Sequence, residues 1–133
     1  MRPDTQALVD KEGSKQLRKK AGLIEEIESR LSPERTVSFV RLTICDNRDT
    51  GSEIGVLLLS DYGVHWKGED GRSPRIDLAW NAMDQAEVTD EKGFFHLVVT
   101  STAPSHRLAF RLYKERETAA FVRQIVAANQ PLL

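Results

Sequence analysis

Between Thr36 and Tyr113 the chain consists of short extended segments, and this succession limits the possible folds more than any other feature of the sequence. Apolar and polar residues alternate within most segments, and turn-forming runs such as SDYG and GEDGRSP separate them. Alternation with a period of two is typical of strands with one buried face. Segments with helical spacing precede and follow the strands. The sequence therefore predicts a small antiparallel barrel or sandwich of seven strands, placed between two helices.

Two of the predicted strands carry patterns that describe their surroundings. In TVSFVRLTIC, Val37 and Phe39 share one phase of the alternation, whereas Val40 and Leu42 begin another. Such a change of phase predicts a β-bulge in a half-buried strand. The next segment, EIGVLLLS, is apolar at almost every position, which indicates a strand that is buried on both faces.

The two helical segments are recognised by apolar residues at steps of three and four. The first helix is predicted over residues 15–31 and ends before Pro33. Its apolar positions are Leu17, Ala21, Ile24, Ile27 and Leu31. The second helix is predicted over residues 114–129, and its apolar face comprises Phe121, Val122, Ile125 and Val126. Because it directly follows the last strand, we expect it to cap one open end of the barrel.

The chain is the size of one domain. Residues 1–14 are polar and contain a proline and a glycine, so we expect a flexible arm there. Residues 15–133 are expected to form a single domain, with the barrel over residues 36–113. The pattern contains no internal repeat and no second domain.

The composition is that of an ordinary water-soluble protein. Of 133 residues, 40% are hydrophobic, and 19 basic against 20 acidic side chains give a net charge of −1. This balance offers no long-range attraction to nucleic acid. The single cysteine, Cys45, lies in an apolar run and cannot form an internal disulfide, which fits a reducing compartment. Without an apolar run as long as a membrane helix, the sequence predicts a cytoplasmic protein, and no cofactor is expected.

The order of segments resembles that of the pleckstrin-homology-like (PH-like) family, in particular its small bacterial members. The resemblance rests on GVLLLSDYGVHWKG followed by RIDLAWNAMDQAEV, and on LAFRLY leading directly into the closing helix. It implies a PH-like, seven-stranded antiparallel barrel with a C-terminal capping helix, to which this chain adds an N-terminal helix. Eukaryotic members usually carry a tryptophan that faces the barrel from the capping helix, and Phe121 is the nearest equivalent here.

The resemblance also implies where a ligand would bind. PH-like domains bind lipids, peptides or proteins and only rarely catalyse reactions, commonly at the open end opposite the capping helix. Three loops are expected at that end: Asp46–Ser52, Gly68–Pro74 and Ser101–His106. The candidate binding residues are Arg41, Arg48, Lys67, Arg72, Arg75 and His106.

Two alternatives remain open. A phospholipid headgroup needs several convergent cations, but the strand EIGVLLLS carries none and the loops mix acidic with basic residues, so lipid binding is expected to be weak. The segment DTGS resembles the signature of aspartic proteases, which pair two carboxylates across a dimer. Here Asp49 lies among charged and turn-forming residues, and a loop is the favoured interpretation.

Other residues with chemical potential fit a structural role better. His65, His96 and His106 lack the spacing of metal ligands, and no metal site or catalytic triad is predicted. Trp66 and Trp80 close apolar strands and are expected in the core. The sequence therefore predicts a non-enzymatic binding or assembly module whose partner is a protein or peptide, including another copy of the chain. The N-terminal helix could pack on its own barrel or on a neighbour.

Overall fold

Helices lie at both ends of the chain and strands lie between them. The computed structural model describes residues 1–47, 51–91, 93–102 and 105–130, without the side chains of residues 102, 105 and 106. The elements are α1 (Pro3–Glu12), α2 (Lys15–Arg18), α3 (Ala21–Glu28), β1 (Val37–Asn47), β2 (Gly51–Ser60), β3 (Gly63–Gly68), β4 (Ile76–Ala79), the 3-10 turn η1 (Trp80–Ala82), β5 (Gln85–Glu91), β6 (Phe94–Thr102), β7 (Ser105–Tyr113) and α4 (Arg116–Asn129).

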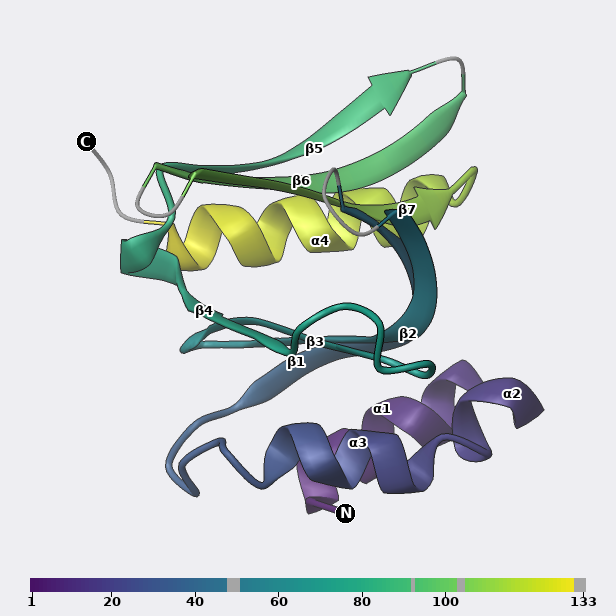
Figure 1. Cartoon of the computed structure of the whole chain (residues 1–133). Coiled ribbons are helices and arrows are strands. Elements are labelled where there is room, and N and C mark those ends of the chain that lie inside the picture. Colours follow the sequence, from purple (N-terminus) through teal and green to yellow (C-terminus); the bar gives the residue numbers. More distant parts are fainter. Residues whose placement is uncertain (48–50, 92, 103–104, 131–133) are drawn as a thin grey trace.

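The strands form one antiparallel sheet that curls into a half-barrel. Their order is β4-β3-β2-β1-β7-β6-β5. Central β1 pairs with β2 over nearly its whole length, but with β7 only through Cys45, Asp46 and Asn47. Figure 1 shows β1 and β2 bending sharply, so that the β5–β7 half of the sheet lies over the β2–β4 half. The prediction of a seven-stranded antiparallel sheet, with helices before and after it, is confirmed.

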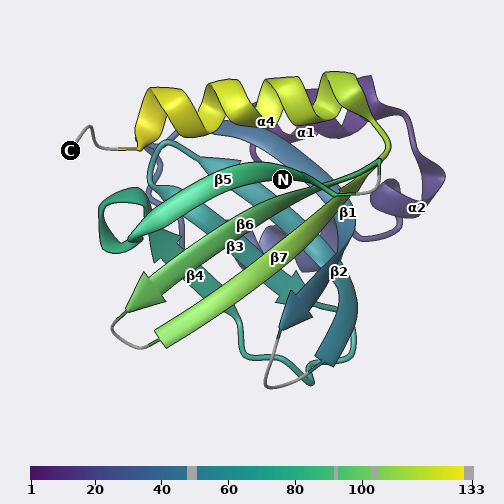
Figure 2. The ribbon, with the colours of Figure 1, turned by 90° about the horizontal axis from the view of Figure 1, so that it is seen from above.

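The inner core fills the space between the two halves of the sheet. Trp66 and Phe110 pack there with ring centroids 5.5 Å apart, and Trp80 is also buried. Helix α4 runs along one end of the half-barrel (Figure 2) and contributes Ala119, Val122, Ile125 and Val126 to this core. The prediction that both tryptophans are core residues is therefore confirmed. Their rings supply much of the apolar area of this small core.

A second core lies on the outer face of the sheet, under the N-terminal helices. Its helical side consists of Val9, Leu17, Ile24 and Ile27, and its strand side of Val37, Val40, Val56 and Leu58. Side chains alternate along a strand, so Leu57 and Leu59 of β2 face the inner core while Val56 and Leu58 face the outer one. The prediction that EIGVLLLS is buried on both faces is confirmed, and the N-terminal helices pack on their own sheet.

The N-terminus differs from expectation in two ways. A flexible arm was expected over residues 1–14, and α1 is there instead, with Val9 buried. Polar contacts hold it: the Asp4 carboxylate accepts the N–H of Val37 at 2.9 Å, and the N–H of Arg2 donates to Glu28 at 3.0 Å. The single helix expected over residues 15–31 is divided into α2 and α3 by a break at residues 19 and 20.

Phe121 was expected on the apolar face of the capping helix. This prediction is wrong, because Phe121 is 45% exposed. Successive residues of a helix are rotated by about 100°, so a face built on Ala119, Val122 and Val126 turns position 121 outward.

Two other predictions, which concern β1, are confirmed. The predicted bulge of β1 is present as a register shift, but it lies between Val37 and Phe39, so these two side chains face opposite cores instead of sharing one face. Cys45 is a buried core residue. Burial and the nearby acidic groups raise the pKa of the Cys45 thiol to about 12, so the thiol stays protonated at neutral pH.

Candidate functional site

The four predicted binding cations whose side chains the structure describes do not converge on one site. Arg41 lies beside the beginning of α4, where its Nη1 is 3.4 Å from Glu115 and its Nη2 is 3.4 Å from the Thr118 hydroxyl. Lys67 pairs with Glu26 of α3 at 3.0 Å. Arg48, like Asp49, lies outside the described residues, and so does the side chain of His106.

Two further candidate arginines hold loops in place. Arg72 donates to the carbonyl oxygen of Ser52 at 3.0 Å. Arg75 pairs with Asp77 at 2.6 Å and donates to the last carbonyl groups of α3, those of Glu26 and Ile27. Cations near a helix C-terminus stabilise its free carbonyl groups. Both arginines are therefore occupied by the fold.

A Ser-His-Asp arrangement that the sequence did not predict lies between β2, β3 and β4. The Ser60 Oγ is 2.9 Å from His65 Nε2, and His65 Nδ1 is 2.8 Å from Asp77 Oδ1. The antiparallel register of β3 and β4 places His65 opposite Asp77, and the turn at residues 60–63 returns Ser60 to His65. Residues 60 and 77 come together through strand pairing, for which the sequence has no local signal.

The surroundings of this arrangement indicate that it stabilises the turn. Ser60 is completely buried, and its Oγ accepts the N–H groups of Tyr62 and Gly63 at 3.1 and 3.3 Å. The hydroxyl therefore donates to His65 Nε2, and His65 donates from Nδ1 to Asp77. A nucleophilic serine must present a free lone pair to its substrate. Here both lone pairs are used and the oxygen is inaccessible.

This network predicts a loss of stability in mild acid. Burial lowers the pKa of His65 and outweighs the opposite effect of Asp77. The unfolded chain therefore binds a proton more readily than the folded one, so the stabilisation is complete above pH about 6.5 and declines as the pH falls toward the folded-state pKa. We expect the free energy of unfolding to fall between pH 7 and pH 5, by up to about 1.4 kcal/mol per pH unit. The urea midpoint should fall with it.

The matched control for this prediction is His65→Gln, which cannot titrate. Its midpoint should not change over the same interval. Carboxylates whose pKa values are lowered, such as Asp77, lose their contribution only below about pH 4 and do not interfere. Equal midpoints of the native protein at pH 7 and pH 5 would contradict the assigned protonation state.

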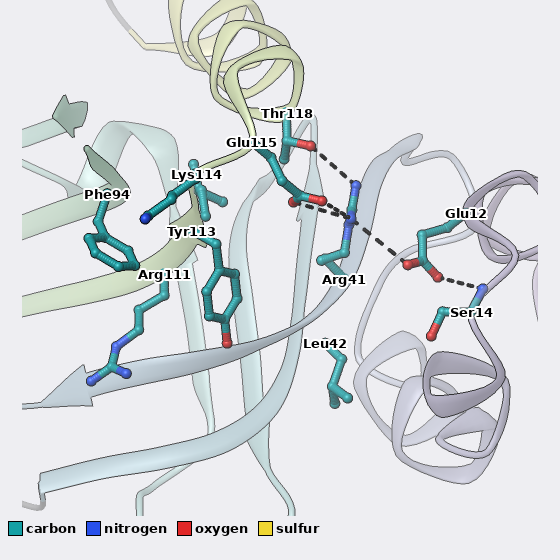
Figure 3. Close-up of a pocket in the computed structure, with 11 residues that line it drawn as sticks. Glu12, Ser14, Arg41, Leu42, Phe94, Arg111, Tyr113, Lys114, Glu115 and Thr118 are labelled. Carbon is teal, nitrogen blue, oxygen red and sulfur yellow. Dashed lines mark hydrogen bonds and ion pairs between the residues drawn. The ribbon is translucent and has the colours of Figure 1, made fainter.

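A hollow of the surface lies where β7 leads into α4. We call it the Tyr113 groove (Figure 3); its volume is about 530 Å³. It is lined by Glu12, Ser14, Arg41, Leu42, Phe94, Arg111, Leu112, Tyr113, Lys114, Glu115 and Thr118. A second hollow, of about 310 Å³, shares Glu12, Arg41 and Thr118 with it and continues toward Phe121. Three elements distant in sequence, α1, β1 and the start of α4, thus form one depression.

Two aromatic rings line the groove while remaining open to solvent. Phe94 is 43% exposed and Tyr113 is 40% exposed. Tyr113 has φ of 56°, and it is the one residue other than glycine with a positive φ among the described residues. This conformation is costly for a bulky side chain and occurs preferentially at functional sites. The turn from β7 into α4 therefore holds the ring at the groove despite an unfavourable backbone.

Several polar side chains of the groove are engaged by partners that lie in the groove or beside it. Arg111 binds Asp46 through two nitrogens, at 3.1 and 3.0 Å. Burial alone would raise the pKa of Asp46, but the hydrogen bonds from Arg111 and Ser52 lower it below its ordinary value. Lys114 lies over the ring of Phe94, with its Nζ 5.1 Å from the centroid. With Arg41, which lies between Glu12 and Glu115, these contacts fix the walls of the groove, and the apolar part of its lining consists of Leu42, Phe94, Leu112 and Tyr113.

Sequence reasoning missed the aromatic residues of this groove. One signal was available for Phe94: adjacent residues of a strand face opposite sides, so the pair Phe94-Phe95 must turn one ring outward. Phe95 is buried and Phe94 is exposed. The sequence contains no comparable signal for Tyr113, because a left-handed conformation is usually announced by glycine or asparagine.

Comparison with known proteins adds no family to this description. The chain matches no model of a protein family and none of the curated proteins. Within the described residues, no helix is long and apolar enough to cross a membrane. The same part of the chain contains no group of three or more histidine, cysteine or acidic residues that could hold a metal ion.

Proposed function

We propose that the protein is a non-enzymatic, cytoplasmic binding module with a PH-like fold, and that the Tyr113 groove receives a segment of a partner protein. The strand order β4-β3-β2-β1-β7-β6-β5, followed by a closing helix, supports the PH-like assignment. The inaccessible Ser60 hydroxyl and the protonated Cys45 thiol support the absence of catalysis.

The strained, half-exposed Tyr113 carries this proposal. A half-exposed aromatic ring offers a large apolar contact to a partner, and strained backbone conformations cluster at functional sites. Tyr113 has both features, and Phe94 lies with it in the groove. Tyrosine and phenylalanine are enriched at the centres of protein interfaces, where their rings form large apolar contacts. The groove is thus suited to an apolar side chain from a protein.

A lipid headgroup is a less suitable ligand. Headgroup phosphates need several free cations that converge. Arg41, Lys67, Arg72 and Arg75 each already bind a carboxylate or a carbonyl oxygen of the chain, and they lie in different places. A phosphate would have to replace these partners one by one.

Co-purification from the native host tests the proposal. We expect the native protein to retain a partner that the variants Phe94→Ala and Tyr113→Ala lose. Truncating an interface aromatic commonly costs about 2 kcal/mol or more, which is roughly a thirtyfold loss of affinity. The control is Ile54→Ala, which removes an exposed apolar side chain that does not line the groove. Equal recovery by the three variants would contradict a role for the groove.

A further inference from the structure

Helix α2 carries a cluster of cations beside the Tyr113 groove. Lys15, Arg18 and Lys19 are all exposed. Among the residues that the structure describes, none of these three has a carboxylate within the 4.0 Å of an ion pair, whereas the next residue, Lys20, pairs with Glu69 at 2.5 Å. We call these three residues the α2 cations. They differ from Arg41, Lys67, Arg72 and Arg75, the predicted binding cations that the structure describes, which the fold already uses.

The α2 cations adjoin the groove through Ser14. Ser14 lines the groove and caps α2, where its Oγ accepts the N–H of Leu17 at 3.2 Å. Residues four apart share a side of a helix, so Arg18 lies on the side of Ser14. Figure 3 shows Ser14 and Glu12 on one side of the groove, with Tyr113, Lys114 and Phe94 across from them. The α2 cations therefore begin at the Ser14 edge of the groove, and Glu12 and Arg41 lie between that edge and the rings of Phe94 and Tyr113 (Figure 3).

We infer that the partner segment is acidic, with an aromatic or large aliphatic side chain in the Tyr113 groove and neighbouring carboxylates over the α2 cations. This inference rests on the proposed function and adds the chemical class of the partner. Complementary charges at the rim of an interface increase the association rate and select the partner, while an apolar anchor at the centre supplies most of the affinity. A flat anionic membrane could meet the cations but would leave the concave groove unfilled.

Selection from a displayed library of random dodecapeptides on the immobilised full-length protein tests both the proposed function and the acidic class of the partner. We expect enrichment of sequences in which aspartate or glutamate accompanies an aromatic residue or leucine. Enrichment of apolar residues without acidic ones would overturn the acidic class and leave the proposed function intact. If no sequence is enriched, or if the enriched peptides bind Tyr113→Ala as well as the native protein, the proposed function itself fails.

Charge reversal of the α2 cations then tests whether these residues contribute to peptide binding. The triple variant Lys15→Glu, Lys19→Glu and Arg18→Glu should bind an enriched, labelled peptide about tenfold more weakly in fluorescence anisotropy. The difference should shrink as salt rises from about 0.05 M to about 0.5 M, because exposed charges are screened. The matched control is Arg107→Glu, an exposed cation on β7 outside the groove, which should change affinity less than about twofold.

Two outcomes would overturn the inference. One is equal affinity of the triple variant and the native protein, with circular dichroism showing that the variant is folded. The other is binding to vesicles of phosphatidylcholine and phosphatidylserine that is lost in the triple variant while peptide binding is retained. In that case the cations serve an anionic lipid surface and not an acidic segment.

Discussion

Replacing Ile24 by alanine is expected to lower the free energy of unfolding by about 2–5 kcal/mol. Ile24 is completely buried in the outer core, together with Leu17 of α2 and Leu58 of β2. Truncation removes the apolar contact with the sheet and leaves a cavity that the curled strands cannot close. Urea denaturation of the native protein and the variant measures the difference.

The control lies two residues away on the same helix. Gly22 is exposed, and an added Cβ there would have no heavy atom within 4 Å. Gly22→Ala should therefore stabilise the protein by up to about 1 kcal/mol, because alanine loses less backbone entropy in a helix. A higher free energy of unfolding for Gly22→Ala and a lower one for Ile24→Ala would show that α3 is a packed helix. Equal midpoints for Ile24→Ala and the native protein would mean that the helices are not part of the folded core.

The N-terminal helices contribute a large part of the stability of the whole domain. Val9, Leu17, Ile24 and Ile27 are each almost completely buried. Full burial of such side chains contributes about 1.5–3 kcal/mol each, or about 6–12 kcal/mol together. A domain of this size has about 5–15 kcal/mol in total. The N-terminal helices are therefore needed to keep the outer face of β1 and β2 out of water.

The strands could be predicted because their residues report directly on burial. The phase change in β1 and the apolar run of β2 each correspond to a feature of the structure, a register shift and a strand between two cores. Side chains in a sheet alternate strictly, so one incorrect assignment would move a whole row to the wrong face. This constraint makes the sequence informative for strands even without knowledge of their partners.

The helices were harder to place because their burial depends on angle and on distant partners. Phe121 was assigned to the capping face as the nearest equivalent of the tryptophan of PH-like domains, although Ala119, Val122 and Val126 fix a face that excludes it. In α1, Thr5 and Val9 are the buried residues, and its position depends on polar contacts such as that of Asp4 with β1. A short polar helix held by tertiary contacts leaves little periodic signal in the sequence.

The candidate site could be predicted only in part, because it depends on register and on a strained turn. The cations were identified by type, but their pairing partners come from α3 and α4. The contact between Ser60, His65 and Asp77 requires the register of β3 with β4. Tyr113 adopts a positive φ that its residue type does not favour. Such features arise only when the whole sheet has formed.

Replacing Glu53 by alanine is expected to release the loop of residues 69–75 and to destabilise the protein by about 2–6 kcal/mol. Glu53 is 2% exposed, and its carboxylate accepts the N–H groups of Asp70 at 3.0 Å and Ser73 at 2.8 Å. Without it, two backbone donors lose their partner, and each unpaired donor costs about 1–3 kcal/mol when buried. An added Cβ at Gly68 would lie 1.8 Å from this carboxylate, so a larger residue at position 68 would displace it.

The acid dependence of stability separates the charge of Glu53 from its packing. Burial would raise the pKa of Glu53, but the hydrogen bonds from Ser73 and Asp70 and the charge of Arg72 together lower it below its ordinary value of 4.5. The folded protein then binds this proton less readily than the unfolded chain, so the stabilisation is complete above pH 4.5 and declines as the pH falls below it. Glu53→Gln keeps one acceptor oxygen and should show a smaller decline, because Asp46 and Asp77 still titrate in this variant.

Glu69→Ala provides the matched control, because it removes an acidic side chain from the same loop. Glu69 is exposed and pairs with Lys20 at the surface, so its loss should cost less than about 1 kcal/mol. Urea denaturation at pH 7 compares the two alanine variants, and hydrogen exchange at Asp70 and Ser73 reports on the loop itself. If Glu53→Ala were no less stable than Glu69→Ala, the buried carboxylate would not hold the loop. Faster exchange confined to residues 69–75 would show instead that the loss is local, with the half-barrel intact.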